Sequence, residues 1–214
     1  TEDGFLTVEN YANYILVLLG FVFMFAAIGF KLSLFPYHTW VPDVYQGSTS
    51  AMAGFLSVVP KMAGFVVALR FFEIFMQVND VIIQTMLYVT VVLTITIPNL
   101  IALQQKDIKR MLSYSSISNA GMAMAAIVIG TQQAINGLFL YWILFTVTNL
   151  GAFGMLWLNR GKEFNDYGSP YTFKKFSGLA QISPFTASIF GIFLFALTGL
   201  PPFALFWGKM YIVA

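Results

Sequence analysis

Long runs without a charged residue divide the chain into apolar segments. Residues 10–30, 81–105 and 111–159 contain no Lys, Arg, Asp or Glu. A membrane-spanning helix needs about 20 predominantly apolar residues, so the third run is too long for one helix, and the polar residues 131–133 divide it in two. A second segment begins at Ser50 with one charge inside it, and the last begins near Pro184. The pattern predicts an all-α membrane protein of one helical domain with six spans, over residues 11–35, 50–72, 81–104, 109–130, 133–158 and 184–214.

Two of these spans are expected to be discontinuous. Pro36 interrupts the first, and a second short segment from His38 to Tyr45 follows it; Pro201 and Pro202 interrupt the last. Proline removes a helix hydrogen bond, and backbone freed inside a membrane must be satisfied by protein or by a water-lined cavity. Such breaks therefore indicate an ion path. Pro60 is expected to break the second span and open a polar gap there.

Composition excludes several classes of protein. Only 9% of the 214 residues are charged, against about 25% in a soluble domain, so a soluble enzyme is excluded. A net charge of +2 without a large basic cluster excludes a nucleic-acid binder. Cysteine is absent, and neither a glycine-rich phosphate loop nor a His/Asp/Glu set with metal-ligand spacing occurs. We therefore expect no cofactor, no metal and no redox chemistry on this chain.

The loop charges predict an orientation. Alternating spans place residues 36–49, 104–110 and 159–182 on one face, which then holds seven of the eleven Lys and Arg residues. The positive-inside rule puts this basic face in the cytoplasm or its organellar equivalent, and the N-terminal end of the chain outside. The chain starts without Met and ends inside an apolar run, so we expect it to be part of a longer protein. The basic face holds Lys106, Lys109, Arg110, Arg160, Lys162, Lys174 and Lys175; the other holds Arg70 with Glu2, Asp3, Glu9, Glu73 and Asp80.

Eight of the eleven Lys and Arg residues lie in predicted loops or at their edges, whereas Lys31, Lys61 and Lys209 do not. Lys61 is the one charged residue between Asp43 and Arg70, and this spacing places Lys61 near the middle of its helix. A lysine at the bilayer centre costs a few kcal/mol on insertion scales and is tolerated mainly when it faces protein or water. A lysine that snorkels to the interface is the alternative, but its side chain covers only part of that depth. We interpret Lys61 as a group that holds and releases a proton.

Spacing alone leaves the other candidates open. Lys31 is either an anchor at the cytoplasmic end of the first span or a functional group just before the break at Pro36. Lys209 is either an interfacial lysine or part of the second discontinuous helix. His38, the only histidine, could relay protons, since its unperturbed pKa is about 6.5; a lone histidine in an aromatic segment is more often structural.

Four motifs resemble a known family. FKLSLFPYHTWVPDVYQG begins at Phe30, VVPKMAGF at Val58, LIALQQKDIKRMLSYSSISNAGM at Leu100 and LFALTGLPPFALFWGKMY at Leu194. They resemble, in order, the antiporter-like subunits of respiratory complex I, the NADH-quinone oxidoreductase. PDVYQG favours the N-type over the L- and M-type relatives.

The resemblance implies roles for the lysines. In the family, the seventh helix carries a lysine just before its break, the eighth another, and the broken twelfth a third after its break. Lys31, Lys61 and Lys209 match these positions, so all three are expected to lie on the hydrophilic axis along which protons cross the membrane. The family has about fourteen helices in two inverted repeats, of which these six would be the seventh to twelfth. The glutamate that pairs with the lysine at position 31 would lie on an absent helix, and we expect no pumping from the fragment alone.

The resemblance also implies surroundings. The expected partners are the other membrane-arm subunits of a complex in the bacterial inner membrane, together with the lipid bilayer. NADH, FMN, iron–sulfur clusters and quinone belong to that complex rather than to this chain, and quinone acts on it only indirectly. Two alternatives remain: a subunit of a multi-subunit cation/proton antiporter or membrane-bound hydrogenase, which share the lysine pattern, and a structural membrane subunit with silent lysines.

Overall fold

The described part of the chain is built from helices. A computed structural model describes residues 8–77, 80–159 and 171–214, and no strand occurs in these ranges apart from a single isolated bridge between Asp107 and Thr172. The predicted all-α fold is thus confirmed. The helices are α1 (Val8–Leu32), α2 (Trp40–Gly47), α3 (Ser50–Gln77), α4 (Val81–Ala102), α5 (Ile108–Ile129), α6 (Gln132–Leu158), α7 (Phe173–Phe176), α8 (Leu179–Ile182), α9 (Pro184–Thr198) and α10 (Ala204–Val213).

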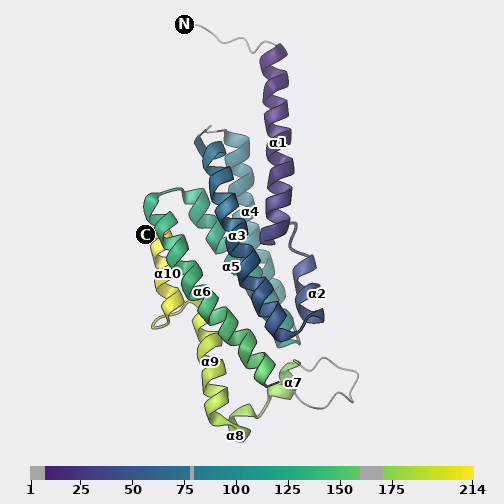
Figure 1. Ribbon diagram of the computed structural model, residues 1–214, viewed down its shortest axis with the longest axis vertical. Coiled ribbons are helices and arrows are strands. Elements are labelled where there is room, and N and C mark those ends of the chain that lie inside the picture. The colour runs from purple at the N-terminus through teal and green to yellow at the C-terminus, as the bar shows by residue number, and fades with distance from the viewer. Residues whose placement is uncertain (1–7, 78–79, 160–170) are drawn as a thin grey trace.

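Five helices are long and apolar enough to cross a membrane. They are α1 and α3 to α6, while the last predicted span consists of the shorter apolar helices α9 and α10. Many large apolar side chains on these helices are exposed, as expected of surfaces that face lipid. Figure 1 shows α3 to α6 side by side, with α1 at one flank and α10 against α6.

Capping residues mark the start or the end of several helices. α5 closes at Gly130, whose φ of 69° is the left-handed conformation that glycine adopts without strain. The next residue, Thr131, caps α6 by accepting a hydrogen bond from the Ala134 amide. Asp107 caps α5 and Asp80 caps α4 in the same way. Gly130 and Thr131 alone connect α5 to α6, and this short connection makes the two helices antiparallel.

The first helix break begins at Ser33, two residues after Lys31. α1 ends at Leu32 because Ser33 takes a φ of 64°, so this helix stops three residues before the predicted residue 35. Backbone groups freed by the break find partners: the amide of Phe35 donates to Thr94 Oγ1 of α4 at 2.9 Å, and Trp40 Nε1 donates to the carbonyl of Phe30 at 3.2 Å. The short helix α2 then continues along α5 and α3.

The second break separates α9 from α10. Gly199, with a φ of 72°, ends α9, and Pro201 and Pro202 lie in the turn that leads to α10. The break predicted at Pro60, by contrast, is wrong. α3 runs uninterrupted from Ser50 to Gln77 through Pro60, because one missing amide removes a single hydrogen bond and the neighbouring turns keep theirs.

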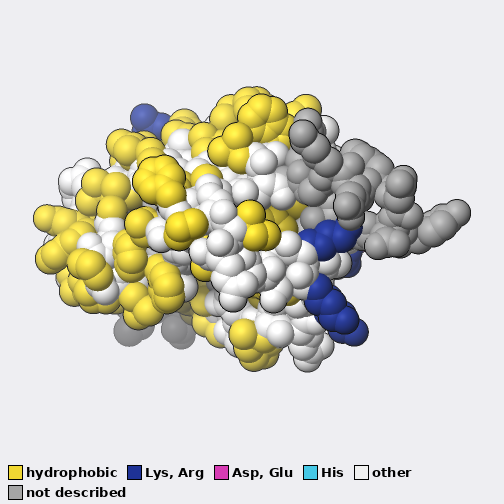
Figure 2. Space-filling view, turned by 90° about the horizontal axis from the view of Figure 1, so that it is seen from below, with side chains coloured by type: hydrophobic (Ala, Val, Ile, Leu, Met, Phe, Trp, Pro, Cys, Tyr) yellow, Lys and Arg dark blue, Asp and Glu magenta, His cyan; other side chains and the backbone are white. Residues whose placement is uncertain are grey.

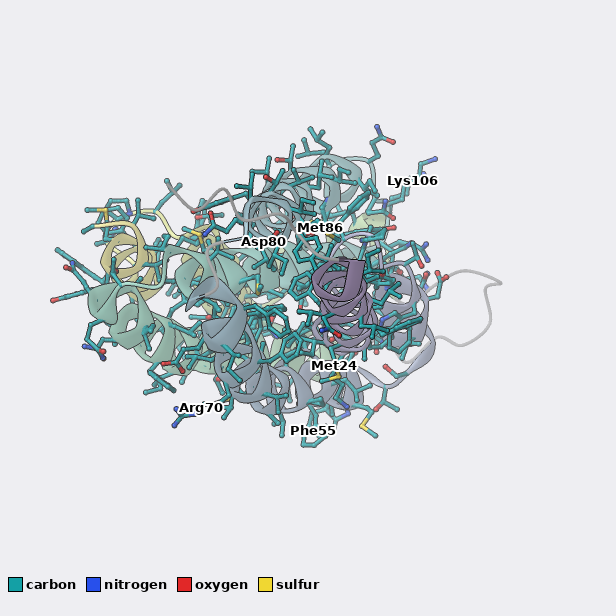
Figure 3. All side chains as sticks on the ribbon, turned by 90° about the horizontal axis from the view of Figure 1, so that it is seen from above. Met24, Phe55, Arg70, Asp80, Met86 and Lys106 are labelled. Atoms are coloured by element: carbon teal, nitrogen blue, oxygen red, sulfur yellow. The ribbon has the colours of Figure 1, made fainter. Side chains whose placement is uncertain are left out.

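The two ends of the helix bundle differ in their charged residues. α2, α7 and the start of α5 share one end, where the amide of Phe173 donates to the carbonyl of Lys106 and that of Ile108 to Tyr171. Dark-blue Lys and Arg side chains gather at one edge of this end (Figure 2). Seen from the other end, Arg70 points away from the bundle (Figure 3). Of the charges used to predict orientation, Glu2, Asp3, Arg160, Lys162 and the side chain of Glu9 lie outside the described residues.

Candidate functional site

Lys61 is buried in the middle of the bundle. It lies on α3 with 1% of its surface exposed. Its Nζ donates to the carbonyl oxygen of Ser116 at 3.2 Å and to the Ser116 hydroxyl at 3.0 Å, both on α5. The ion pairs among the described residues lie elsewhere, so neutral oxygens alone hold this amine. A buried ammonium without a counter-ion is costly, so the site favours a group whose charge can change.

A polar stretch of α5 continues from Ser116. Asn119 Nδ2 donates to the carbonyl of Ser115 at 2.9 Å, and the hydroxyl of Tyr141 on α6 donates to Asn119 Oδ1 at 2.7 Å. Tyr141 is fully buried and Asn119 nearly so. Our sequence analysis missed both as functional candidates, although serine and asparagine concentrated in one spanning helix were a usable signal.

Lys209 lies beyond this stretch, on α10. Its Nζ donates to the carbonyl of Thr198, the last residue of α9, at 2.9 Å. A helix C-terminus carries partial negative charge and so favours a cation. Lys209 also borders an open groove of about 530 Å³ that Ser115 and Asn119 line from α5. The structure therefore brings Lys61 and Lys209 to the same polar segment of α5.

Lys31 lies apart from this segment. It is the last residue but one of α1, and its side chain is exposed. It borders a shallow groove of about 310 Å³ between α1 and α3, together with Gly64 and Val67. Within the described part of the chain, no hydrogen bond or ion pair holds its amine.

His38 lies in the first break and is buried. Its ring stacks on Phe35 with 5.6 Å between centroids. Nδ1 is buried and makes no hydrogen bond to a described residue. The structure does not bring His38 into contact with Lys61 or Lys209, so its role as a relay stays a prediction.

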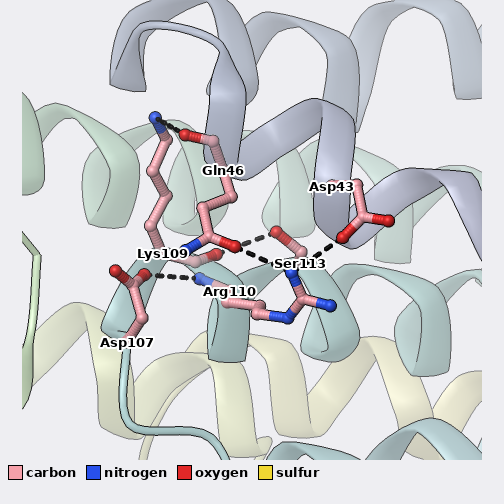
Figure 4. A network of polar contacts seen from close by, with 6 residues as sticks. All are labelled: Asp43, Gln46, Asp107, Lys109, Arg110 and Ser113. Carbon is pink, nitrogen blue, oxygen red and sulfur yellow. Dashed lines mark hydrogen bonds and ion pairs between the residues drawn. The ribbon is translucent and has the colours of Figure 1, made fainter. Parts of the chain in front are cut away.

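A second polar cluster joins α2 to the start of α5 (Figure 4). The guanidinium of Arg110 donates to Asp43 Oδ1 and to Gln46 Oε1, each at 2.7 Å. Lys109, beside it, is 1% exposed and donates to the backbone carbonyls of Gln46 and Ser48. Sequence spacing placed Lys109 and Arg110 in a loop that only sets orientation, and the contact of α2 with α5 was not predictable from it.

The fold and the site together define a polytopic helical membrane protein, built around two broken helices and a buried lysine that is held by neutral oxygens. The sequence identifies the family to which such a protein belongs. The chain belongs to the family described as NADH:quinone oxidoreductase/Mrp antiporter, transmembrane, which matches residues 2–214. The resemblance predicted from the four motifs is thereby confirmed.

Curated relatives carry a consistent name. The chain is 54% identical over 210 residues to NADH-quinone oxidoreductase subunit N of Sulfurimonas denitrificans, a match that covers 98% of this chain and 42% of that protein. It is 49% identical to the protein of the same name from Helicobacter hepaticus, over 98% of this chain and 43% of that protein. The chain thus spans about two fifths of the length of these relatives.

Solved structures share the fold. A chain of respiratory complex I from Thermus thermophilus with bound aureothin is 32% identical, with a TM-score of 0.69 over 86% of this chain and 39% of that one. A chain of the membrane-bound sulfane sulfur reductase, an archaeal respiratory membrane complex, is 25% identical, with a TM-score of 0.76 over 87% of this chain and 37% of that one.

Proposed function

We propose that the chain is part of an N-type, proton-translocating subunit in the membrane arm of an NADH-quinone oxidoreductase. Two kinds of observation support this proposal. The relatives of highest identity reported above are named as subunit N of that enzyme. The single structural observation that carries it is Lys61, which is buried in a spanning helix and, among the described residues, is hydrogen-bonded only to the oxygens of Ser116.

The proposed mechanism moves protons between lysines. A charged lysine raises the free energy of a second charge nearby, so a proton gained at one position favours its loss at the next. Lys61 takes and releases the proton in the centre, and the polar stretch of α5 leads from it to the groove at Lys209. Quinone reduction in another part of the complex supplies the free energy by shifting these charge states.

The proposed role of Lys31 depends on parts of the subunit outside this chain. Its amine has no partner among the described residues, and it borders the open groove between α1 and α3. We propose that helices outside this chain cover that groove and supply the membrane glutamate that the family resemblance implies. Lys31 would then complete the axis with Lys61 and Lys209.

The proposed setting follows from the same assignment. The chain lies in the bacterial inner membrane, with the α2 and α7 end in the cytoplasm and the start of α1 on the periplasmic side. The other membrane-arm subunits and lipid are its partners, and nucleic acid is not. NADH, FMN, iron–sulfur clusters and quinone are bound elsewhere in the complex, so this chain carries no redox step.

Replacement of Lys61 tests the proposal. Lys61→Met keeps the length of the side chain but cannot bind a proton, so we expect the complete complex in proteoliposomes to lose most of its proton pumping. Lys106→Met removes an exposed lysine from the loop before α5 and serves as the control. Pumping per NADH and the amount of assembled complex are measured together. Wild-type pumping by assembled Lys61→Met would refute the role of Lys61.

A cation/proton antiporter or another respiratory complex is the second candidate. The family description includes Mrp antiporters, and one structural match is a sulfane sulfur reductase. PDVYQG and the names of the relatives favour the oxidoreductase. Purification of the complex from its own membranes decides between them, because only an NADH-quinone oxidoreductase oxidises NADH with quinone. The remaining candidate, a structural subunit with silent lysines, predicts that Lys61→Met pumps normally.

A further inference from the structure

Lys109 is a second buried lysine, at the basic end of the bundle. It is the second residue of α5, and 1% of its surface is exposed. Its Nζ donates to the carbonyl of Gln46 at 3.3 Å and to that of Ser48, and lies 4.9 Å from the centroid of the Tyr171 ring. These contacts are to neutral groups, and Asp107 is the acid that acts on it electrostatically. Lys109, like Lys61, is therefore buried and hydrogen-bonded to neutral oxygens, but it lies at the end of the bundle rather than in its middle.

Lys109 and the partner of Lys61 share one face of α5. Lys109, Ser113 and Ser116 stand at positions i, i+4 and i+7, which project from the same side of a helix. Ser113 is buried, and its hydroxyl donates to the carbonyl of Lys109 at 2.8 Å. At about 1.5 Å per residue, Ser116 lies roughly 10 Å further along the helix axis. This face thus runs from the basic end to the oxygens that bind Lys61.

Two further buried hydroxyls come from α2 and α3, the helices that pack against α5. Tyr45, next to Gln46 on α2, has a buried hydroxyl that approaches Ser116 without a well-formed hydrogen bond. Ser50, at the start of α3, also has a buried hydroxyl without a partner among the described residues, and it lies on the same helix face as Lys61, eleven positions earlier. Buried hydroxyls without a protein partner normally bind ordered water. The hydroxyls of Tyr45 and Ser50 therefore have the chemistry that a hydrogen-bonded chain between the two lysines needs.

We propose that Lys109 is a proton-uptake group that supplies Lys61 from the basic end of the bundle. This inference rests on the proposed function. The ammonium of Lys109 gives up one proton to the Tyr45 hydroxyl, and each group in the chain accepts one proton and releases another. A new N–H bond forms on the neutral amine of Lys61 through Ser116. The neutral Lys109 then regains a proton from the aqueous phase, beside the exposed Asp43 and Arg110 pair.

A capping role for Lys109 is the competing explanation. Lysine near a helix C-terminus stabilises the last carbonyls, and Lys109 binds that of Gln46 at the end of α2. Lys109→Arg separates the two roles, because arginine keeps the charge and the donors but does not release its proton at accessible pH. Tyr45→Phe removes one hydroxyl and keeps the ring, which packs against Phe153.

The test uses the complete oxidoreductase complex in proteoliposomes, with Lys106→Arg as the matched control on the exposed part of the same connection. Proton uptake from the basic side during NADH oxidation is measured together with assembly. We expect Lys109→Arg and Tyr45→Phe to assemble and to slow proton uptake at least about tenfold, as for the loss of a proton-transfer group. The control should match the wild type.

The outcomes separate this inference from the proposed function. If Lys109→Arg pumps normally while Lys61→Met does not, Lys109 only caps α2, and the uptake role is overturned. If Lys61→Met also pumps normally, the proposed function itself fails. If Lys109→Arg does not assemble, Tyr45→Phe decides: slowed uptake supports the route, and unchanged uptake overturns it.

Discussion

A substitution at Gly199 tests the placement of Lys209 in the second helix break. Its φ of 72° is left-handed, and a Cβ added there would stand 2.8 Å from both Cδ and Nζ of Lys209. Gly199→Ala therefore makes two changes. The backbone cost of a left-handed alanine is roughly 1–2 kcal/mol, and the lysine must swing away from the carbonyl of Thr198, which it reaches at 2.9 Å.

The second change can be isolated with a matched glycine. Gly130 has nearly the same φ, 69°, but the nearest atom to an added Cβ is the carbonyl oxygen of Ile127 at 3.7 Å. Gly130→Ala should cost the backbone term alone. A hydrogen bond to a charged group contributes about 1.5–3 kcal/mol, and the lower end applies because Lys209 is partly exposed. We expect Gly199→Ala to destabilise the protein by about 1–2 kcal/mol more than Gly130→Ala.

Two assays follow the two consequences. The free energy of unfolding of the full-length subunit is measured by titration with a denaturing detergent in mixed micelles, for both alanine variants and for Lys209→Ala with and without Gly199→Ala. In the Lys209→Ala background, Gly199→Ala should cost the backbone term alone, because the lysine is absent. In the complete complex, Gly199→Ala should reduce pumping and Gly130→Ala should not. Equal unfolding free energies and equal pumping for the two single variants would refute the placement of Lys209 against Gly199.

Two further predictions concern packing and pH. A Cβ on Gly137 would lie 2.8–2.9 Å from backbone atoms of Tyr211 on α10, which cannot rotate away, whereas a Cβ on Gly154 meets nothing within 4 Å. In a detergent titration, Gly137→Ala should therefore lower the free energy of unfolding by about 1–3 kcal/mol. Gly154→Ala should leave it unchanged or raise it by up to about 1 kcal/mol. The hydrogen bond from the Tyr14 hydroxyl, together with the capped amides of α4, lowers the pKa of Asp80. Since its pKa is lower folded than unfolded, its stabilisation is present above the unfolded value of about 4 and is lost as the pH falls through the folded value. The acid loss of unfolding free energy should therefore be smaller in Asp80→Ala than in the wild type.

Much of the fold was predictable because membrane spans obey simple rules. Runs without charge locate helices, since an unpaired charge in lipid is costly. The division of the longest run at 131–133 follows from local chemistry, because Gly130 ends one helix and Thr131 caps the next. Helix ends set by distant contacts were not predictable. α1 stops at Leu32 rather than at residue 35, and the amide of Phe35 is bound by Thr94 from another helix.

The site was predictable only in part. The position of Lys61 among uncharged residues indicated a buried amine, but its partner Ser116 depends on how α3 packs against α5. Lys109 shows the opposite case. Its neighbours Lys106 and Arg110 in the sequence are exposed or partly exposed, and nothing local distinguishes it from them. Lys109 is covered by distant contacts, with the carbonyls of Gln46 and Ser48 at the end of α2 and with the ring of Tyr171.

α5 is the least apolar of the five long helices and also the most deeply buried. Its polar residues therefore lie inside the bundle, where the proposed proton route runs. In the most apolar stretch of each span, 78% of the residues of α5 are buried, against 28% in α1. In lipid, apolar side chains gain nothing by leaving the surface, so helices rich in Ser, Asn, Gly and Ala are the ones that protein must surround. Lys109 belongs to this helix, Lys61 binds it through Ser116, and Ser115 and Asn119 of the same helix line the groove at Lys209. Ser116→Ala therefore removes a hydroxyl that binds Lys61 and lies on the proposed uptake route, whereas a change on the lipid-facing side of α1 acts on no group of that route.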